Sequence, residues 1–155
     1  MLLTMLTLCL ALPAHAADSG LEYRLKVPEG GKDGVPFAFD HAAEQYFSPL
    51  PFMTAADFTN ARARPSKNPN TPGDWEVVLT HSATGRAKFR AVADADRSRE
   101  FCIVFHGTLY QCEAFPPVVK GVYDQDRSFG SRLTQAMAEK LAAEMEKEIR
   151  AKRRR

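Results

Sequence analysis

The chain has 155 residues, of which 45% are hydrophobic and 26% are charged. It is too short for two full domains and too apolar for a disordered chain. The 21 Lys and Arg residues nearly balance the 19 Asp and Glu residues, and the net charge of +2 gives no support for nucleic-acid binding across the whole surface. Three cysteines are too few for a small domain built on disulfides. The length, composition and charge together predict one ordinary globular domain.

The N-terminus has the features of a secretory signal. Residues 1–12 are apolar and uncharged, and as a helix they would span only ~18 Å, less than the ~30 Å of a membrane core. Pro13 interrupts the run, and Ala14-His15-Ala16 places small residues at the −3 and −1 positions of a cleavage site. We therefore expect residues 1–16 to be a signal peptide. Residues 17–155 would form one domain, soluble after cleavage in the periplasm or outside the cell. The alternative is a buried N-terminal helix.

The first half of the remaining chain predicts two strands and a short helix. Residues 21–27 alternate apolar and polar side chains, as in a half-buried strand, and the glycines and prolines of residues 28–36 predict a loop. Residues 37–47 are ambiguous, with one helical turn compatible with 42–46, and the prolines of 48–53 require an extended chain. Thr54 and Asp57 have the spacing of a capping box, which predicts a short helix ending near Ala63.

The second half predicts a strand, a helix, a hairpin and a final helix. A proline-rich loop at 64–74 leads into an alternating strand at 75–81, and residues 83–94 have helical periodicity. Residues 101–105 and 108–112 form the arms of a hairpin, and a last strand is expected near 118–129. Thr134 or Ser131 would cap the final helix, with Glu144, Lys147 and Glu148 away from an apolar stripe. The members of this stripe are Met137, Ala138, Leu141, Ala142 and Met145. The order predicts an α+β fold with an antiparallel-rich sheet covered by helices.

Cys102 and Cys112 lie in the two arms of the hairpin, and disulfides persist in exported proteins. Their pairing depends on the register. A two-residue turn at His106-Gly107 places Cys102 opposite Gln111, so that the cysteines point to opposite sides. A three-residue loop places Cys102 directly opposite Cys112, where a disulfide can form. Apolar patterning favours the first register and the compartment favours the second, so both stay open. A redox enzyme is less favoured because the chain has no C-x-x-C motif.

Several short motifs follow one another along residues 46–146. They are Ser48-Pro-Leu-Pro51 with Phe52-Met-Thr-Ala55, Gly85 with Phe89 after the strand at 75–81, Cys102-Ile-Val-Phe-His-Gly107 with Leu109–Cys112, and Thr134 before Ala138-Glu-Lys-Leu-Ala142. In this order and spacing they resemble the first periplasmic (head) domain of SecD, a subunit of the bacterial protein-export machinery. The resemblance implies a head-like domain and, by analogy of fold, contact with emerging polypeptide.

The chain also departs from the SecD pattern. Ala55 stands where the family has glycine, His106 where it has the hairpin aspartate, and Glu113 where it has proline. The loop at 64–74 is an insertion. No later apolar run approaches 18 residues, so the membrane bundle that the proton-coupled motor needs is missing. The resemblance therefore implies a stand-alone exported domain rather than the motor.

No set of residues has the spacing of a known catalytic, cofactor or metal site. His41, His81 and His106 form no i, i+4 pair and no Cys-His zinc pattern. The segment 29–34 has the wrong glycine spacing for a P-loop, and the Asp pairs at 94/96 and 124/126 offer too few ligands for calcium. We expect no cofactor and no metal. A small exported enzyme that uses His41, His106 and nearby carboxylates is the rival hypothesis, and it requires these groups to converge in one cleft.

The C-terminus is strongly basic. Residues 146–155 contain six Lys or Arg and two Glu, a net charge of +4, so the rest of the chain carries −2. The first interpretation is a solvated helix end, where cations are favourable. The second is weak attraction of Lys152, Arg153, Arg154 and Arg155 to an anionic membrane surface.

The leading hypothesis is a non-catalytic exported module that binds a polypeptide or cell-envelope protein through a sheet edge or the hairpin, for which strand addition is one mode. The motif resemblance and the missing catalytic set support it. A structural partner or inhibitor of another secreted protein is a third hypothesis, which no residue separates from the first.

Overall fold

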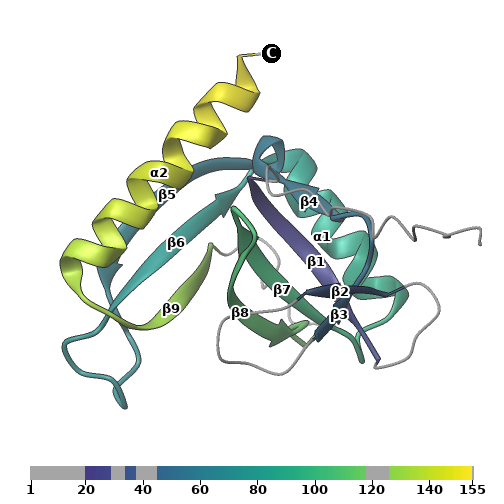
Figure 1. Ribbon diagram of the computed structural model, residues 1–155, viewed down its shortest axis with the longest axis horizontal. Coiled ribbons are helices and arrows are strands. Elements are labelled where there is room, and N and C mark those ends of the chain that lie inside the picture. The colour runs from purple at the N-terminus through teal and green to yellow at the C-terminus, as the bar shows by residue number, and fades with distance from the viewer. Residues whose placement is uncertain (1–19, 29–33, 38–44, 118–125, 155) are drawn as a thin grey trace, which may run out of the picture.

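The computed structural model describes residues 20–28, 34–37, 45–117 and 126–154. These residues form the expected α+β fold, in which antiparallel strands make two sheets and two helices pack on them (Figure 1). The elements are, in chain order, β1 (Leu21–Val27), β2 (Val35–Phe37), β3 (Gln45–Phe47), β4 (Met53–Thr54), the 3-10 turn η1 (Ala55–Asp57), β5 (Phe58–Pro65), β6 (Trp75–His81), α1 (Ala83–Ala95), β7 (Glu100–Phe105), β8 (Thr108–Ala114), β9 (Arg127–Leu133) and α2 (Gln135–Arg153).

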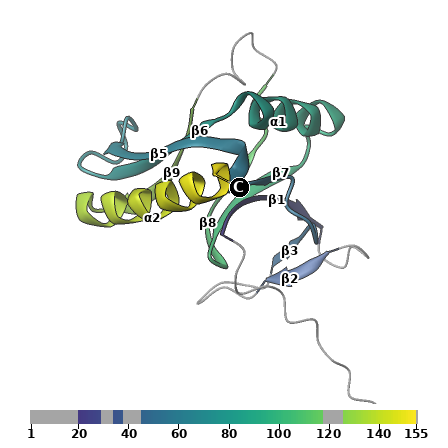
Figure 2. The same ribbon diagram turned by 90° about the horizontal axis from the view of Figure 1, so that it is seen from above.

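The first sheet has the strand order β2-β3-β1-β7-β8, with β4 paired to β1, and the second has the order β5-β6-β9. Helix α1 lies on one side of β1 and β7, and the β2–β3 hairpin lies on the other (Figure 2). Helix α2 packs along β5 and also contacts β6 and β9. The two sheets and both helices share one apolar core, in which Tyr23, Phe89 and Phe101 are fully buried. The rings of Phe89 and Phe101 are 5.1 Å apart, edge to face.

Several predicted elements are confirmed. The strands at 21–27 and 75–81 are observed with those bounds, and the helix predicted at 83–94 ends at Ala95. Thr134 caps α2, because its hydroxyl accepts a hydrogen bond from the backbone N–H of Met137. The last strand begins at Arg127, later than expected; residues 118–125 lie outside the described part of the chain, as do residues 38–44. Gln45–Phe47 is a strand, so the end of the helical turn considered at 42–46 is not helical.

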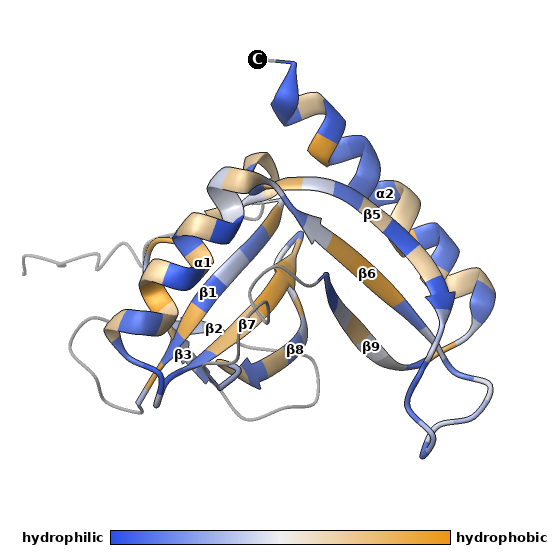
Figure 3. Ribbon diagram, turned by 180° about the vertical axis from the view of Figure 1, so that it is seen from behind, coloured by the Kyte–Doolittle hydropathy of each residue, from blue (hydrophilic) through white to orange (hydrophobic). Residues whose placement is uncertain are grey.

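The helix predicted from Thr54 to Ala63 is wrong. The capping box exists, because the Asp57 carboxylate accepts the backbone N–H of Thr54 at 3.0 Å, but it closes only the single turn η1. The chain then continues as strand β5, which pairs with β6 from Phe58 to Pro65. A capping box organises one turn, whereas residues 60–65 alternate polar and small apolar side chains with the period of a strand. Pairing with the strongly apolar β6 (Figure 3) therefore decides the conformation.

The apolar stripe predicted for α2 is confirmed except at Met137. Ala138, Leu141, Ala142, Met145 and also Ile149 are buried, but Met137 is 54% exposed. Successive residues are about 100° apart around a helix, so Met137 lies beside the stripe rather than on it. Glu148, expected to point away, is half-buried and accepts the backbone N–H of Leu21 at 3.0 Å.

Gly85 allows a close approach between α1 and η1. A Cβ atom at this position would lie 2.1 Å from the backbone oxygen of Asp57. Four residues further along the helix, Phe89 enters the core. The glycine and phenylalanine of the Gly-x-x-x-Phe motif therefore set how α1 sits on the rest of the domain.

Candidate functional site

Strands β7 and β8 form a hairpin and are connected by the two-residue turn His106-Gly107. Both turn residues have positive φ angles, of 46° and 75°. This is the geometry of a type I′ turn. Phe105 pairs with Thr108 and Val104 with Leu109 in the register that such a turn sets. The register then shifts by one residue, so that Ile103 pairs with Gln111 and Cys102 with Cys112. Tyr110 is the extra residue of this β-bulge.

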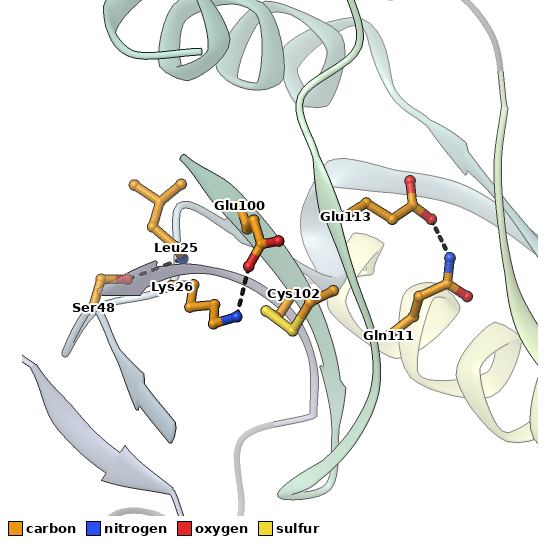
Figure 4. The surroundings of a disulfide bond; sticks show 8 residues. Leu25, Lys26, Ser48, Glu100, Cys102, Gln111 and Glu113 are labelled. Atoms are coloured by element: carbon orange, nitrogen blue, oxygen red, sulfur yellow. Dashed lines mark hydrogen bonds and ion pairs between the residues drawn. A yellow bond between two sulfur atoms is a disulfide. The ribbon is translucent and has the colours of Figure 1, made fainter. Parts of the chain in front are cut away.

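The bulge brings the two cysteines together. Cys102 and Cys112 form a disulfide, and their Cα atoms are 4.0 Å apart (Figure 4). Each of the two registers left open by the sequence is therefore correct over part of the hairpin. The two-residue turn is present, and the cysteines are nevertheless directly opposite. Disulfides are typical of oxidising compartments.

The disulfide also determines which way the backbone of β8 faces. A short Cα distance marks a non-hydrogen-bonded pair, in which the N–H and C=O groups of both residues point away from the partner strand. The backbone groups of Cys112 and, two residues on, of Ala114 therefore point away from β7. Within the described residues, β8 pairs with β7 alone, which makes it an edge strand of the first sheet.

Side chains engage the backbone at other exposed edges. The Glu146 carboxylate of α2 accepts the backbone N–H of Ala61 in β5 at 2.9 Å. The Gln111 side-chain oxygen accepts the backbone N–H of Gly130 in β9 at 3.1 Å. Such contacts block the pairing of an edge with another chain. The edge of β8 differs, because no side chain among the described residues accepts the backbone N–H of Cys112 or Ala114.

The carboxyl group of Glu113, in β8, has a perturbed pKa. Burial raises the pKa of Glu113, and the nearby Arg127 and the hydrogen bond from the Gln111 amide oppose this shift. Arg127 comes from the start of β9 and lies 5.1 Å from the centre of the Phe89 ring. Arg127 of the second sheet and the half-buried Glu113 of the first sheet thus lie near each other where the two sheets meet.

Two further polar side chains lie in the core. Burial lowers the pKa of His81 to about 4, and Arg127 and Arg86 add to the shift. Burial likewise raises the pKa of Tyr23, which is fully buried. Among the described residues, neither the two ring nitrogens of His81 nor the hydroxyl of Tyr23 has a hydrogen-bond partner. A neutral His81 packed edge-on against Tyr23 at 5.7 Å is a core residue and is unsuited to proton transfer with solvent.

The other predicted site residues are spread over the molecule. His106 is 56% exposed in the hairpin turn, with its Nε2 atom 3.8 Å from a Glu148 carboxylate oxygen. His41 lies outside the described residues, so the convergence that the enzyme hypothesis requires stays a prediction. Lys152, Arg153 and Arg154 are exposed at the end of α2, and Arg155 lies outside the described range. Among the described residues, no three His, Cys, Asp or Glu side chains are placed to hold a metal ion.

The Gln111–Glu113 pair and the roles of Glu146 and Glu148 were missed from the sequence. The two helix glutamates sit among many charged residues of similar spacing, and no local pattern marks those that turn inward. One feature of the sequence could have indicated the bulge at Tyr110. This feature is the conflict between the hairpin register that apolar patterning favours and the register that a disulfide requires.

Neither models of known protein families nor curated protein sequences match this chain. Solved structures do. A crystal structure of SecDF in a super-membrane-facing form has a TM-score of 0.61 and 19% identity over 83% of this chain and 18% of the SecDF chain. Another SecDF structure, described as that of a membrane component that enhances protein export, has a TM-score of 0.56 and 17% identity over 86% of this chain and 62% of that one.

This chain therefore spans less than two thirds of either SecDF chain. In the part of the chain that the structure describes, no helix is long and apolar enough to cross a membrane. At these identities the similarity is one of fold, and the fold of this chain is similar to that of a region of SecDF.

Proposed function

We propose that this chain is a non-catalytic exported binding module, related in fold to the periplasmic head domain of SecD, that binds an extended polypeptide by strand addition along β8. The observation that carries the proposal is the outward-facing backbone of an edge strand held in place by a disulfide. The similarity to SecDF, a component that enhances protein export, supports polypeptide as the class of partner.

The physical basis is that strand addition uses backbone hydrogen bonds, which are independent of the partner's sequence. The disulfide joins β8 to the central strand β7, so the edge is ordered before a partner arrives and less conformational entropy is lost on binding. The side chains of β8 would add modest selectivity. Leu109 and Tyr110 are half-buried and apolar in part, which suits a partner segment with some apolar side chains.

Amide NMR of the ¹⁵N-labelled protein tests the proposal directly. The titrant is a reduced and carboxymethylated model protein that cannot fold. We expect the amide resonances of Cys112 and Ala114 to shift and their hydrogen exchange to slow on binding. Shifts confined to other elements, or no shift, would contradict strand addition at β8.

A pair of variants at one position sharpens the test. Ala114→Pro removes an outward N–H, and proline is tolerated at such edge positions. Ala114→Val keeps the N–H and serves as the matched control. Loss of one hydrogen bond, at about 1 kcal/mol, predicts roughly fivefold weaker binding for the proline variant alone. Equal affinities of the two variants would argue against backbone pairing at this edge.

A further inference from the structure

The exposed side of the C-terminal half of α2 carries a positively charged surface, which we call the basic face. It is formed by Lys147, Arg150 and Arg154 around Ala143 and Ala151. All five residues are exposed, and their spacing of four, seven, eight and eleven positions from Ala143 places them on one side of a helix. The buried Met145 and Ile149 face the core on the other side.

The carboxylates of this part of the helix are drawn toward the body of the protein. Glu146 accepts the backbone N–H of Ala61 at 2.9 Å and also pairs with Arg150 at 2.7 Å. Glu148 accepts the backbone N–H of Leu21 at 3.0 Å. Glu144 is the exposed carboxylate at the border of the face. Lys147 and Arg154 form no ion pair with any residue that the structure describes, so their charges face solvent.

Positive charge also increases toward the tip of the helix. After Ile149 the described residues include Arg150, Lys152, Arg153 and Arg154 and contain no carboxylate. The end of α2 extends beyond the sheets (Figure 1), and its last turns are mostly hydrophilic (Figure 3). The cations are therefore available to a large, flat partner that could not reach a recessed site.

The small side chains of Ala143 and Ala151 matter for the shape of the surface. Together with the basic residues and Glu146 they line a shallow depression of about 510 Å³. An alanine at its centre leaves space beside the long Lys and Arg side chains, which can then adjust to a charged group while their aliphatic parts stay near the helix. The depression is open rather than enclosed, which suits the surface of a lipid bilayer better than a small molecule.

We propose that the basic face and the tip of α2 bind the headgroup surface of a membrane that contains anionic phospholipid. The contact is electrostatic, and no apolar side chain of the face inserts into the bilayer. It would place the domain on the membrane with the tip of α2 foremost. The inference does not depend on strand addition, because β8 and the basic face use different residues.

The test measures binding to vesicles of phosphatidylcholine alone and with about 30% phosphatidylglycerol, by sedimentation at about 0.05 M and about 0.5 M NaCl. The protein is expressed from its full sequence and used in the form the cell exports. All variants share the same N-terminal residues, so any contribution from these cancels in the ratio of affinities. We expect binding to the anionic vesicles at low salt and loss of binding at high salt, because the Debye length falls below 10 Å.

Two double variants identify the surface. Lys147→Gln with Arg154→Gln removes two cations of the basic face, and a basic residue near an anionic surface contributes about fivefold in affinity, so the pair predicts roughly 25-fold weaker binding. Lys67→Gln with Arg132→Gln makes the same change in net charge at two exposed positions outside α2 and should retain most of the affinity. Unchanged thermal unfolding shows that both variants fold.

Three results would overturn the proposal. The first is equal binding of the two double variants, which would mean that net charge alone is responsible. The second is binding that persists at high salt or on phosphatidylcholine alone. The third is displacement from anionic vesicles by inorganic phosphate but not by chloride at the same ionic strength, which would identify a site for free phosphate instead.

Discussion

Breaking the Cys102–Cys112 disulfide is expected to lower the free energy of unfolding by about 2.7 kcal/mol. The bond joins residues separated by 10 positions, and the loop-closure entropy that such a crosslink removes from the unfolded chain corresponds to this value at 25 °C. For a domain of this size the change lowers Tm by roughly 10 °C. The effect acts on the unfolded state, so the far-UV circular dichroism of the native state should be unchanged.

Urea unfolding of the protein with and without reductant measures this free energy. Cys112→Ala is the better variant for comparison, because Cys102 is fully buried and Cys112 is half-buried. In either condition the variant should unfold at the same urea concentration as the reduced natural protein. A difference below about 0.5 kcal/mol between the oxidised and reduced protein would refute the reasoning. So would two free thiols at residues 102 and 112 in the unfolded, unreduced protein.

Two other substitutions test the core. A glycine-to-alanine change inside a helix normally stabilises it by about 1 kcal/mol. In Gly85→Ala, however, the new Cβ would lie 2.1 Å from the Asp57 backbone oxygen, so we expect the free energy of unfolding in urea to fall by about 1–3 kcal/mol. A rise in this free energy would show that α1 does not pack so closely on η1. Burial lowers the pKa of His81 from 6.5 to about 4, so the unfolded state binds more protons within that range. The free energy of unfolding should therefore fall by about 3 kcal/mol as the pH is lowered from 6.5 to 4. His81→Leu should remove this part of the pH dependence, and an unchanged profile would place the titration elsewhere.

Most of the fold could be predicted because its strongest elements carry their own periodicity. Strand β1 alternates along its whole length and β6 along most of it, and α2 has a buried stripe that continues to Ile149. Strand β5 could not be found in the same way. Between Phe58 and Pro65 at its ends, its apolar side chains are only the small Ala61 and Ala63, and the capping box before it predicts a helix. Its conformation comes from pairing with β6, which is a nonlocal interaction that no short window of sequence contains.

The candidate site was predictable only in part. The hairpin and its cysteines were recognised from local pattern, and the basic tail from charge alone. The inward turn of Glu146 and Glu148 depends on where α2 lies against β5 and β1, which is a matter of tertiary packing. The same holds for Arg127, which adds to the lowering of the His81 pKa by burial and opposes the raising of the Glu113 pKa by burial.

The bulge at Tyr110 gives the cysteine spacing a meaning of its own. Across a regular hairpin with a two-residue turn, the sequence numbers of facing positions always differ by an odd number. The numbers of Cys102 and Cys112 differ by 10, which is even. The parity alone therefore requires that a two-residue turn be combined with one inserted residue if the cysteines are to bond. Deleting a single residue between Gly107 and Cys112 would restore an odd spacing, and the cysteines would then face each other across a regular hairpin that needs no bulge. The disulfide therefore selects for a hairpin that is irregular at one defined place.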